Sequence, residues 1–197
     1  MISYAIADAA VQAPPQLLAR VQQLNDLGAD FIQLRAKELD TPAFLALAEG
    51  CRKRVDGNGT KFVVNSRADI AMAVDADGVH LPADGMPAYA VRALRPGLQI
   101  GRSCHSAGDV KRAAGEGCDY VLIGPLFSPR SKIGGPPLEE NEIRACARVP
   151  IPLFALGGME RSRLRSLAAL PIDGIAAVTL FMADEPIAEI MEEVRAL

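Results

Sequence analysis

Short apolar runs alternate with longer amphipathic runs along the whole chain, and this alternation most constrains the fold. Runs of β-branched and aliphatic residues bounded by turn residues are typical of buried strands, whereas longer Ala-, Leu- and Arg-rich amphipathic runs are typical of helices. We expect strands at residues 2–7, 31–35, 61–65, 78–81, 98–103, 119–123, 151–156 and 173–178. We expect helices at residues 14–27, 41–55, 67–74, 86–94, 106–115, 138–147, 159–169 and 184–196.

The boundaries of the predicted helices carry local signals. Thr41-Pro42 is typical of an N-cap followed by a first-turn proline, and Ser106 precedes another predicted helix. Gly28, Gly97 and Gly115 mark predicted helix ends. Three phrases at helix-to-strand junctions, LGADFIQL, VDADGVHL and EGCDYVLI, resemble one another, as expected of a repeated βα unit.

Eight successive strand–helix units predict an α/β protein with parallel strands, closed into a single (β/α)8 TIM barrel. The alternative is an open doubly wound sheet, which usually has a glycine-rich turn after its first strand. The corresponding segment here, AIADAAVQAP, contains no glycine, which favours the barrel. No shift in composition divides the chain, so we expect one domain over residues 1–197 with short loops.

Charge and cysteine content argue against several classes of function. The net charge of −3 and the pI of about 5.5 give no support for a nucleic-acid partner or an anionic membrane surface. The four cysteines fit no zinc-binding spacing and, with no signal peptide expected, are predicted to be free thiols in a reducing cytoplasm. No apolar run reaches about 18 residues, so no membrane span is expected. The oligomeric state stays open, and a homodimer is one of the options.

The segment FIQLRAKELD places polar side chains at alternate positions directly after an apolar start. Alternate residues of a strand share a face, so Gln33, Arg35 and Lys37 are predicted to form a donor-rich, cationic wall at the barrel mouth. An Arg fork and a Lys ammonium are both suited to phosphate or carboxylate. The alternative is a pair of solvated cations at a strand end.

Further polar residues fall at the predicted carboxyl ends of the strands, where barrels carry their active sites. His80 and His105, the two histidines of the chain, end neighbouring strands, together with Asn65 and Ser103. The alternative for each histidine is a structural role with its hydrogen bonds satisfied. Cys104 adjoins His105 but is predicted to point to the opposite face, which argues against a thiol–imidazole pair.

Two segments indicate an anion near the last strands. Gly157-Gly158 follows the seventh strand and Val178-Thr179 ends the eighth, where barrels frequently bind phosphate through backbone N–H groups. The loop at residues 124–137 contains Lys132 and is long for this chain, which predicts a basic lid over the mouth. The alternatives are an ordinary glycine turn and an ordinary exposed connection.

Over nearly its full length the chain resembles the thiamine phosphate synthase and thiazole tautomerase family. The matching segments are YAIAD, IQLRAK, VVNSRADIAMAVDADGVHL, IGRSCHS, DYVLIGPLFSPRSK, LGGM and DGIAAV, in this order. The resemblance implies a (β/α)8 barrel of thiamine biosynthesis that binds a small-molecule thiazole phosphate. It also implies that Gly158, Val178 and Thr179 hold that phosphate.

The family has two branches, and the resemblance assigns them different chemistry. The synthase joins a pyrimidine pyrophosphate to the thiazole phosphate with Mg²⁺ on two aspartates, one in an NDR motif and one in a GQED-type segment. Here these segments are Asn65-Ser66-Arg67 and PADG, with Gly85 at the second aspartate position and Asp84 beside it. Since Mg²⁺ needs hard, charged oxygen ligands, the metal site is expected to be absent or rearranged.

The tautomerase branch moves a proton on a dihydrothiazole carboxylate phosphate and uses a histidine in an IGRSVHS-like segment, which is similar to IGRSCHS here. We therefore expect an isomerase without cofactor. In this reading His105 transfers the proton, and Arg35, Lys37 or Lys132 faces the carboxylate. The remaining predicted binding residues are Gln33, Asn65, His80 and Ser103, with Gly157, Gly158, Val178 and Thr179 on the phosphate. The alternatives are a synthase, which would need Mg²⁺ at an altered site, and a non-catalytic protein that binds a phosphate ligand.

Overall fold

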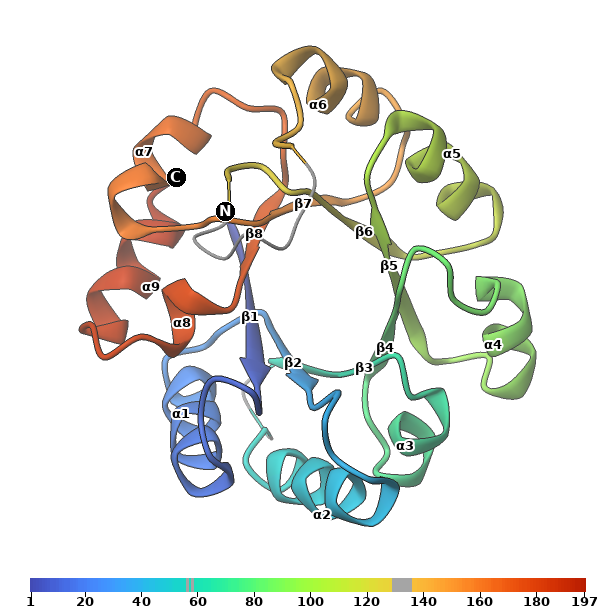
Figure 1. Ribbon diagram of the computed structural model, residues 1–197, viewed down its shortest axis with the longest axis vertical. Helices are drawn as coiled ribbons and strands as arrows, with labels where there is room; N and C mark the ends of the chain where they lie inside the picture. The colour runs from blue at the N-terminus through green and yellow to red at the C-terminus, as the bar shows by residue number, and fades with distance from the viewer. Residues whose placement is uncertain (56, 58, 129–135) are drawn as a thin grey trace.

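Eight parallel strands close into a barrel inside a ring of helices in the computed structural model of the chain (Figure 1). The structure describes residues 1–55, 57, 59–128 and 136–197. Strand order round the barrel follows chain order, from β1 to β8, and β8 pairs with β1. This topology confirms the predicted single (β/α)8 TIM barrel. The strands are β1 Ile2–Asp8, β2 Phe31–Arg35, β3 Lys61–Asn65, β4 Gly78–Leu81, β5 Gln99–Cys104, β6 Tyr120–Ile123, β7 Leu153–Leu156 and β8 Gly174–Ala177.

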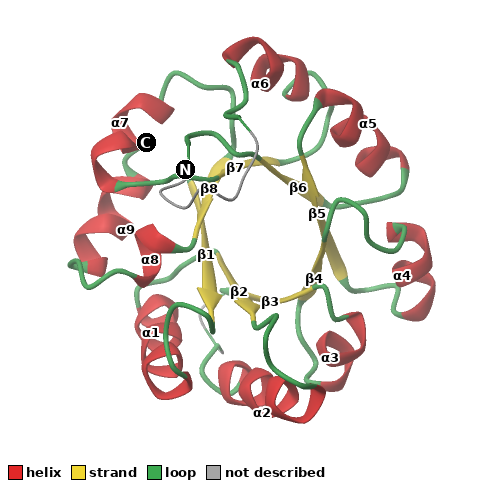
Figure 2. Cartoon of the chain, viewed as in Figure 1, coloured by secondary structure: helices red, strands yellow, loops and turns green. Residues whose placement is uncertain are grey.

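The helices lie on the outer surface of the barrel, one or more after each strand (Figure 2). Each buries an apolar stripe against the strands, and together these contacts form the larger of two apolar clusters. The helices are α1 Pro14–Asp26, α2 Thr41–Arg52, α3 Ala68–Ala73, α4 Ala88–Leu94, α5 Ala107–Gly115, α6 Glu140–Cys146, α7 Leu164–Leu167, α8 Thr179–Met182 and α9 Ile187–Arg195, with a 3-10 turn at Arg161–Arg163 before α7.

The structure corrects several predicted boundaries. The cap of α2 is Asp40, whose side chain accepts a hydrogen bond from the Ala43 N–H at 2.9 Å, and Thr41 already belongs to the helix. Gly115 lies inside α5, and the turn after it uses Gly117 at φ 86°. Ser106 caps α5 as predicted, with its Oγ accepting from the Asp109 N–H.

Two helical segments differ from the sequence-based prediction. The run expected to be one helix over residues 159–169 is a 3-10 turn followed by the single turn of α7. The extra helix α8 directly follows β8 and was not predicted. Four residues are too few to show a helical period, so the apolar run continues the strand pattern in the sequence alone.

The barrel interior forms a second, smaller cluster dominated by aromatic rings. Tyr4, Phe31, Tyr120 and Phe154 pack with ring centroids 5.1–6.0 Å apart. Gly101, opposite Tyr120 in the β5–β6 register, makes this packing possible, because a Cβ there would lie 2.1 Å from the Tyr120 Cζ. The aromatic layer closes the centre of the barrel, so a ligand is confined to its ends.

Two remaining sequence expectations concern cysteines and membranes. Cys51, Cys104, Cys118 and Cys146 are buried, and none forms a disulfide. Within residues 1–55, 57, 59–128 and 136–197, no helix has the length and apolar character needed to span a bilayer.

Candidate active site

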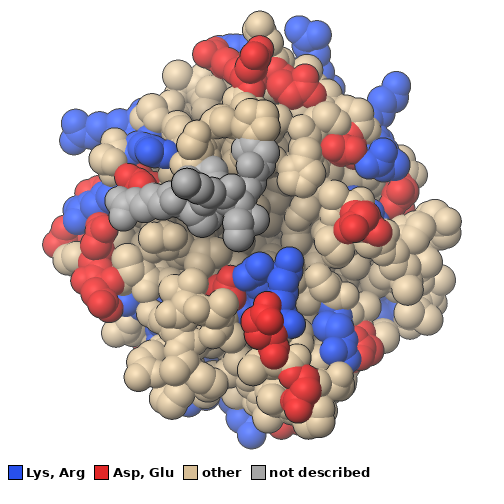
Figure 3. Space-filling model, in the orientation of Figure 1, with Lys and Arg blue, Asp and Glu red and all other residues tan. Residues whose placement is uncertain are grey.

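The carboxyl ends of the eight parallel strands share one end of the barrel, so the predicted site residues on them gather there. Figure 3 shows a hollow in one face of the molecule, with Lys, Arg, Asp and Glu side chains beside it. Lys132 and the centre of the predicted lid lie outside the described residues. The predicted roles of the other residues stay predictions.

Gln33 does not reach solvent as part of an open cationic wall; it is buried in a hydrogen-bonded chain. The Tyr4 hydroxyl donates to Gln33 Oε1 at 2.9 Å, and Gln33 Nε2 donates to Asn65 Oδ1 at 3.3 Å. The Tyr120 and Tyr4 hydroxyls lie 2.8 Å apart. Burial raises the pKa of both tyrosines, so both hydroxyls stay protonated and able to donate. This series of hydrogen bonds extends from the aromatic interior to Asn65 at the end of β3.

Arg35 and Lys37 have different surroundings, although the sequence grouped them. Arg35 forms an ion pair with Asp8 at the end of β1, where the buried Asp8 carboxylate also accepts from the Ala10 N–H at 3.0 Å. Lys37 is exposed beyond β2. It contributes, with Asn65 and neighbouring residues, to a small pocket of about 310 Å³. Of the two cations, Arg35 is the one whose charge a neighbouring carboxylate compensates, whereas no ion pair involves Lys37 within the described residues.

His80 is buried and neutral. Its Nε2 lies 2.9 Å from Ser103 Oγ, and its ring stacks on Tyr120 with centroids 5.9 Å apart. Burial, and then the charge of Arg102, lower the pKa of His80 to about 3. An imidazole with so low a pKa takes no proton near neutral pH, so His80 is suited to orient Ser103 rather than to act as a general base.

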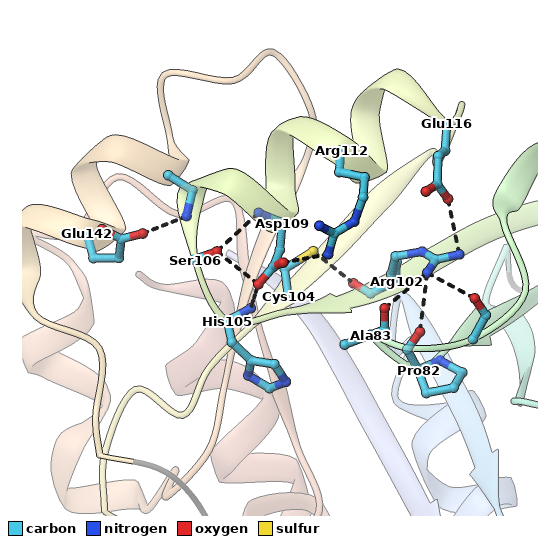
Figure 4. A network of polar contacts seen from close by, with 12 residues as sticks. Pro82, Ala83, Arg102, Cys104, His105, Ser106, Asp109, Arg112, Glu116 and Glu142 are labelled. Atoms are coloured by element: carbon cyan, nitrogen blue, oxygen red, sulfur yellow. Dashed lines mark hydrogen bonds and ion pairs between the residues drawn. The ribbon is translucent and has the colours of Figure 1, made fainter.

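His105 is exposed at the end of β5 and lines a pocket of about 930 Å³ between β5, β6, β7 and residues 136–142. Its Nδ1 lies 2.6 Å from the Gly124 carbonyl oxygen, which can only accept, so Nδ1 carries the proton. In the neutral ring, Nε2 is then a proton acceptor. Figure 4 shows the ring extending away from Asp109. Cys104 is buried on the other face, where burial raises the pKa of its thiol to about 12.

Gly157 and Gly158 follow β7 with φ of 106° and 63°, which glycine adopts without strain. A Cβ on Gly158 would lie 2.8 Å from Phe127, so this glycine also permits a close approach of two loops. Val178 is the N-cap of α8 and Thr179 its first residue. Because Leu156 pairs with Ala176, Gly157 and Gly158 lie one and two residues beyond this pair, and Val178 and Thr179 lie two and three residues beyond it on the neighbouring strand. First-turn N–H groups of a helix lack intrahelical partners, so they are donors suited to an anion.

The residues at the two expected Mg²⁺ positions do not fit this metal. Ser66 offers a hydroxyl in place of a carboxylate, and Gly85 has no side chain. A Cβ at Gly85 would lie 2.8 Å from the Pro82 ring, so even alanine would displace the turn. Asp84 is exposed beside it. Among the described residues, no group of three or more His, Cys, Asp or Glu side chains is placed to hold a metal ion.

Sequence reasoning missed several residues that organise this end of the barrel: Tyr4, Asp8, Arg102 and Tyr120. Tyr4 and Asp8 lie at even positions of β1, as Ile2 and Ile6 do, so the strand period alone indicates that they point inward. No local signal identifies their partners, because those partners lie on other strands.

Comparisons with known proteins place the chain in a family. The family model described as "Thiamine monophosphate synthase" matches residues 3–181. The thiamine-phosphate synthase of Methanoculleus marisnigri is 39% identical over 162 residues, covering 80% of this chain and 76% of the relative. The thiamine-phosphate synthase of Gloeobacter violaceus is 36% identical over 173 residues, covering 87% of this chain and 51% of the relative.

A solved structure is also similar. The thiamine phosphate pyrophosphorylase from Pyrococcus furiosus superposes with a TM-score of 0.85 at 29% sequence identity, covering 99% of this chain and 94% of that chain. The expected assignment to the tautomerase branch is wrong on these findings, because the matched relatives are named synthases. The matches instead favour the alternative reading. The chain belongs to the thiamine monophosphate synthase family.

Proposed function

We propose that the protein is a thiamine-phosphate synthase that joins a pyrimidine pyrophosphate to a thiazole phosphate. In this transfer, a bond to the thiazole phosphate forms as the bond to pyrophosphate breaks. The observation that carries the proposal is the family match over residues 3–181, supported by relatives named thiamine-phosphate synthase at 36% and 39% identity.

The two anionic ends of the reaction have separate positions at the mouth. We assign the thiazole phosphate to Gly157, Gly158, Val178 and Thr179, at the ends of β7 and β8. We assign the pyrimidine pyrophosphate to the side of β2 and β3, where Lys37 is exposed and Asn65 is held by Gln33. The pocket of about 930 Å³ beside Ser103 and His105 is within the size range of small-molecule sites.

His105 then has a supporting role in this reading. Its Nδ1 hydrogen bond to Gly124 fixes the ring, and its Nε2 can accept a hydrogen bond from a substrate. Asp8 compensates the charge of Arg35, so this cation orders the ends of β1 and β2. We assign no step to Mg²⁺, because the residues at positions 66 and 85 do not fit it.

A specific observation favours a second candidate, a protein that binds the thiazole phosphate without turnover. That observation is the replacement of both expected carboxylates, by Ser66 and Gly85. The anion site at β7 and β8 does not depend on these positions, so binding would survive the loss of the transfer reaction.

The test mixes purified protein with both substrates, with and without MgCl2, and measures thiamine phosphate and pyrophosphate by chromatography. Equal amounts of both products support the synthase. Binding of thiazole phosphate by calorimetry without product supports the second candidate, and absence of binding contradicts both.

A matched pair of variants locates the phosphate. Gly158→Ala strains a residue at φ 63° and brings a Cβ within 2.8 Å of Phe127, so we expect at least tenfold weaker binding of thiazole phosphate. Gly97→Ala is the control, since a Cβ there meets nothing within 4 Å. Equal affinity of the two variants would contradict the assignment.

A further inference from the structure

The small pocket at the ends of β2 and β3 differs in character from a metal site. Its volume is about 310 Å³, and its polar lining consists of Lys37, Asn65, Ser66 and Arg67. No carboxylate belongs to the lining described for this pocket. The remaining lining residues, Ala36, Leu39 and Phe44, are apolar. Since its polar groups are two cations, an amide and a hydroxyl, the pocket favours a negatively charged ligand over a cation.

The buried hydrogen-bond network determines which atom of the Asn65 side chain faces the pocket. The Tyr4 hydroxyl donates to Gln33 Oε1, so Gln33 presents its amide nitrogen to Asn65. That nitrogen donates a hydrogen bond to the Asn65 carbonyl oxygen at 3.3 Å. Asn65 therefore directs its Nδ2 donor toward the mouth, and the Gln33 amide takes one of the two lone pairs of its carbonyl oxygen.

Ser66 continues the same polarity. Its Oγ accepts from Asn65 Nδ2 at 3.0 Å, which leaves the hydroxyl hydrogen as a donor. Its backbone lies at φ 63°, an uncommon conformation for a residue with a side chain, and its N–H donates to the His80 carbonyl oxygen at 2.8 Å. Such strained residues cluster at functional sites, where surrounding contacts hold them.

The two cations contribute unequally. Arg67 donates to Asp69 through Nε and NH2 at 2.9 and 2.6 Å, and this pairing neutralises part of its charge. Lys37 is exposed and forms no ion pair with the part of the chain that the structure describes. The strongest uncompensated charge at the pocket is therefore the Lys37 ammonium.

The turn after β4, where a synthase would carry its second metal carboxylate, is closed by a buried arginine. Arg102 NH1 donates to the carbonyl oxygens of Pro82, Ala83 and Gly85 at 3.3–3.5 Å, and its NH2 pairs with Glu116 at 3.2 Å (Figure 4). The guanidinium therefore donates hydrogen bonds to carbonyl oxygens of this turn. A Cβ at position 85 would require the turn to move.

We propose that the pocket of Lys37, Asn65, Ser66 and Arg67 binds a phosphate-type oxyanion of the substrate directly, without a divalent cation. This inference rests on the proposed function, in which the leaving group is pyrophosphate. The donors of the pocket replace the metal as the partner of that anion, with Lys37 supplying the charge and Asn65 and Ser66 the hydrogen bonds.

Calorimetry with inorganic pyrophosphate tests the proposal, first in excess EDTA and then in excess MgCl2. We expect binding in EDTA, with no more than about a twofold gain in affinity from Mg²⁺. Lys37→Gln should weaken binding about tenfold, the usual effect of losing one charge-assisted hydrogen bond. Lys61→Gln is the matched control, because Lys61 is exposed at the opposite end of the barrel, at the start of β3.

Ser66→Asp provides a second, independent variant. Aspartate tolerates positive φ, so the variant is expected to fold, and its carboxylate would repel the anion and weaken metal-free binding at least tenfold. A tenfold or larger gain from Mg²⁺ in the unaltered protein would overturn the proposal. Equal affinity of the Lys37 and Lys61 variants, or of Ser66→Asp and the unaltered protein, would overturn it as well.

The two proposals fail in different ways. Metal-independent binding of pyrophosphate at Lys37 without any thiamine phosphate formed would contradict the proposed synthase and leave the anion pocket standing. Product formation that goes with Mg²⁺-dependent pyrophosphate binding would contradict the anion pocket and leave the synthase standing.

Discussion

Replacing Gly101 by alanine tests how the barrel interior supports the mouth. The added Cβ would lie 2.1 Å from the Tyr120 Cζ, whereas non-bonded carbons prefer about 3.5–4.0 Å, so the ring must move by more than about 1 Å. Tyr120 is buried against Tyr4, Phe154 and His80, which leaves it little room. Its hydroxyl would also leave the hydrogen bond to Tyr4.

The expected loss of stability combines two effects. Overpacking a well-packed core costs about 1–3 kcal/mol, and a lost buried hydrogen bond about 1 kcal/mol. We therefore expect Gly101→Ala to lower the free energy of unfolding by about 3 kcal/mol. In a chain of this length that corresponds to a Tm lower by about 6–12 °C. Urea denaturation followed by circular dichroism, together with calorimetry, measures both quantities.

Two controls make this prediction refutable. Gly97→Ala adds the same methyl group where nothing lies within 4 Å, so its effect should stay within about 0.5 kcal/mol. Combining Gly101→Ala with Tyr120→Leu removes the clashing ring, so the double variant should be at least about 1 kcal/mol more stable than the sum of the single effects. Equal stability of the two alanine variants would refute the packing argument.

Three further variants test the polar groups of the interior. His80 has a folded-state pKa of about 3, below its unfolded value of about 6.5. Between these pH values the unfolded chain binds one more proton than the folded chain. The free energy of unfolding therefore falls as the pH drops through this window. His80→Gln should remove about 1 kcal/mol per pH unit from that slope between pH 6 and 5, and an unchanged slope in urea denaturation would contradict the buried neutral ring. Tyr4→Phe leaves Gln33 Oε1 without its donor, so we expect about 1–3 kcal/mol lower stability. We also expect roughly threefold weaker pyrophosphate binding by calorimetry. Unchanged binding would show that Asn65 keeps its orientation without the Tyr4 hydroxyl. Arg102→Met removes a positive charge near His80 and should raise the pKa of that imidazole, as measured by NMR titration; a constant pKa would show that burial alone sets it.

Much of the candidate site was predictable because barrel geometry converts strand ends into neighbours. Asn65, His80 and Ser103 end consecutive strands in the sequence, and the parallel register places them at the same end. The interior position of Gln33 follows from the same alternation. Its burial did not, because burial depends on how far the neighbouring strands extend past it.

The function of the chain was not predictable from its local motifs alone. IGRSCHS and PADG are similar to the tautomerase pattern, and the matched relatives are named synthases. These local motifs drew attention to His105 and to the two missing carboxylates, and so favoured a tautomerase. The family match extends over residues 3–181, so it depends on the whole barrel rather than on those few positions.

The sequence by itself determined the order, type and approximate bounds of the strands, and with them the closed barrel. It could do so because strand and helix periods are properties of the local backbone, repeated here in each βα unit. Only the tertiary structure decided which side chains meet. Arg35 finds Asp8 and Tyr4 finds Tyr120 across 27 and 116 residues of chain, and closure of the barrel brings them within hydrogen-bond distance. Those contacts decide which cation has its charge compensated by a carboxylate and which atom of the Asn65 side chain faces the barrel mouth.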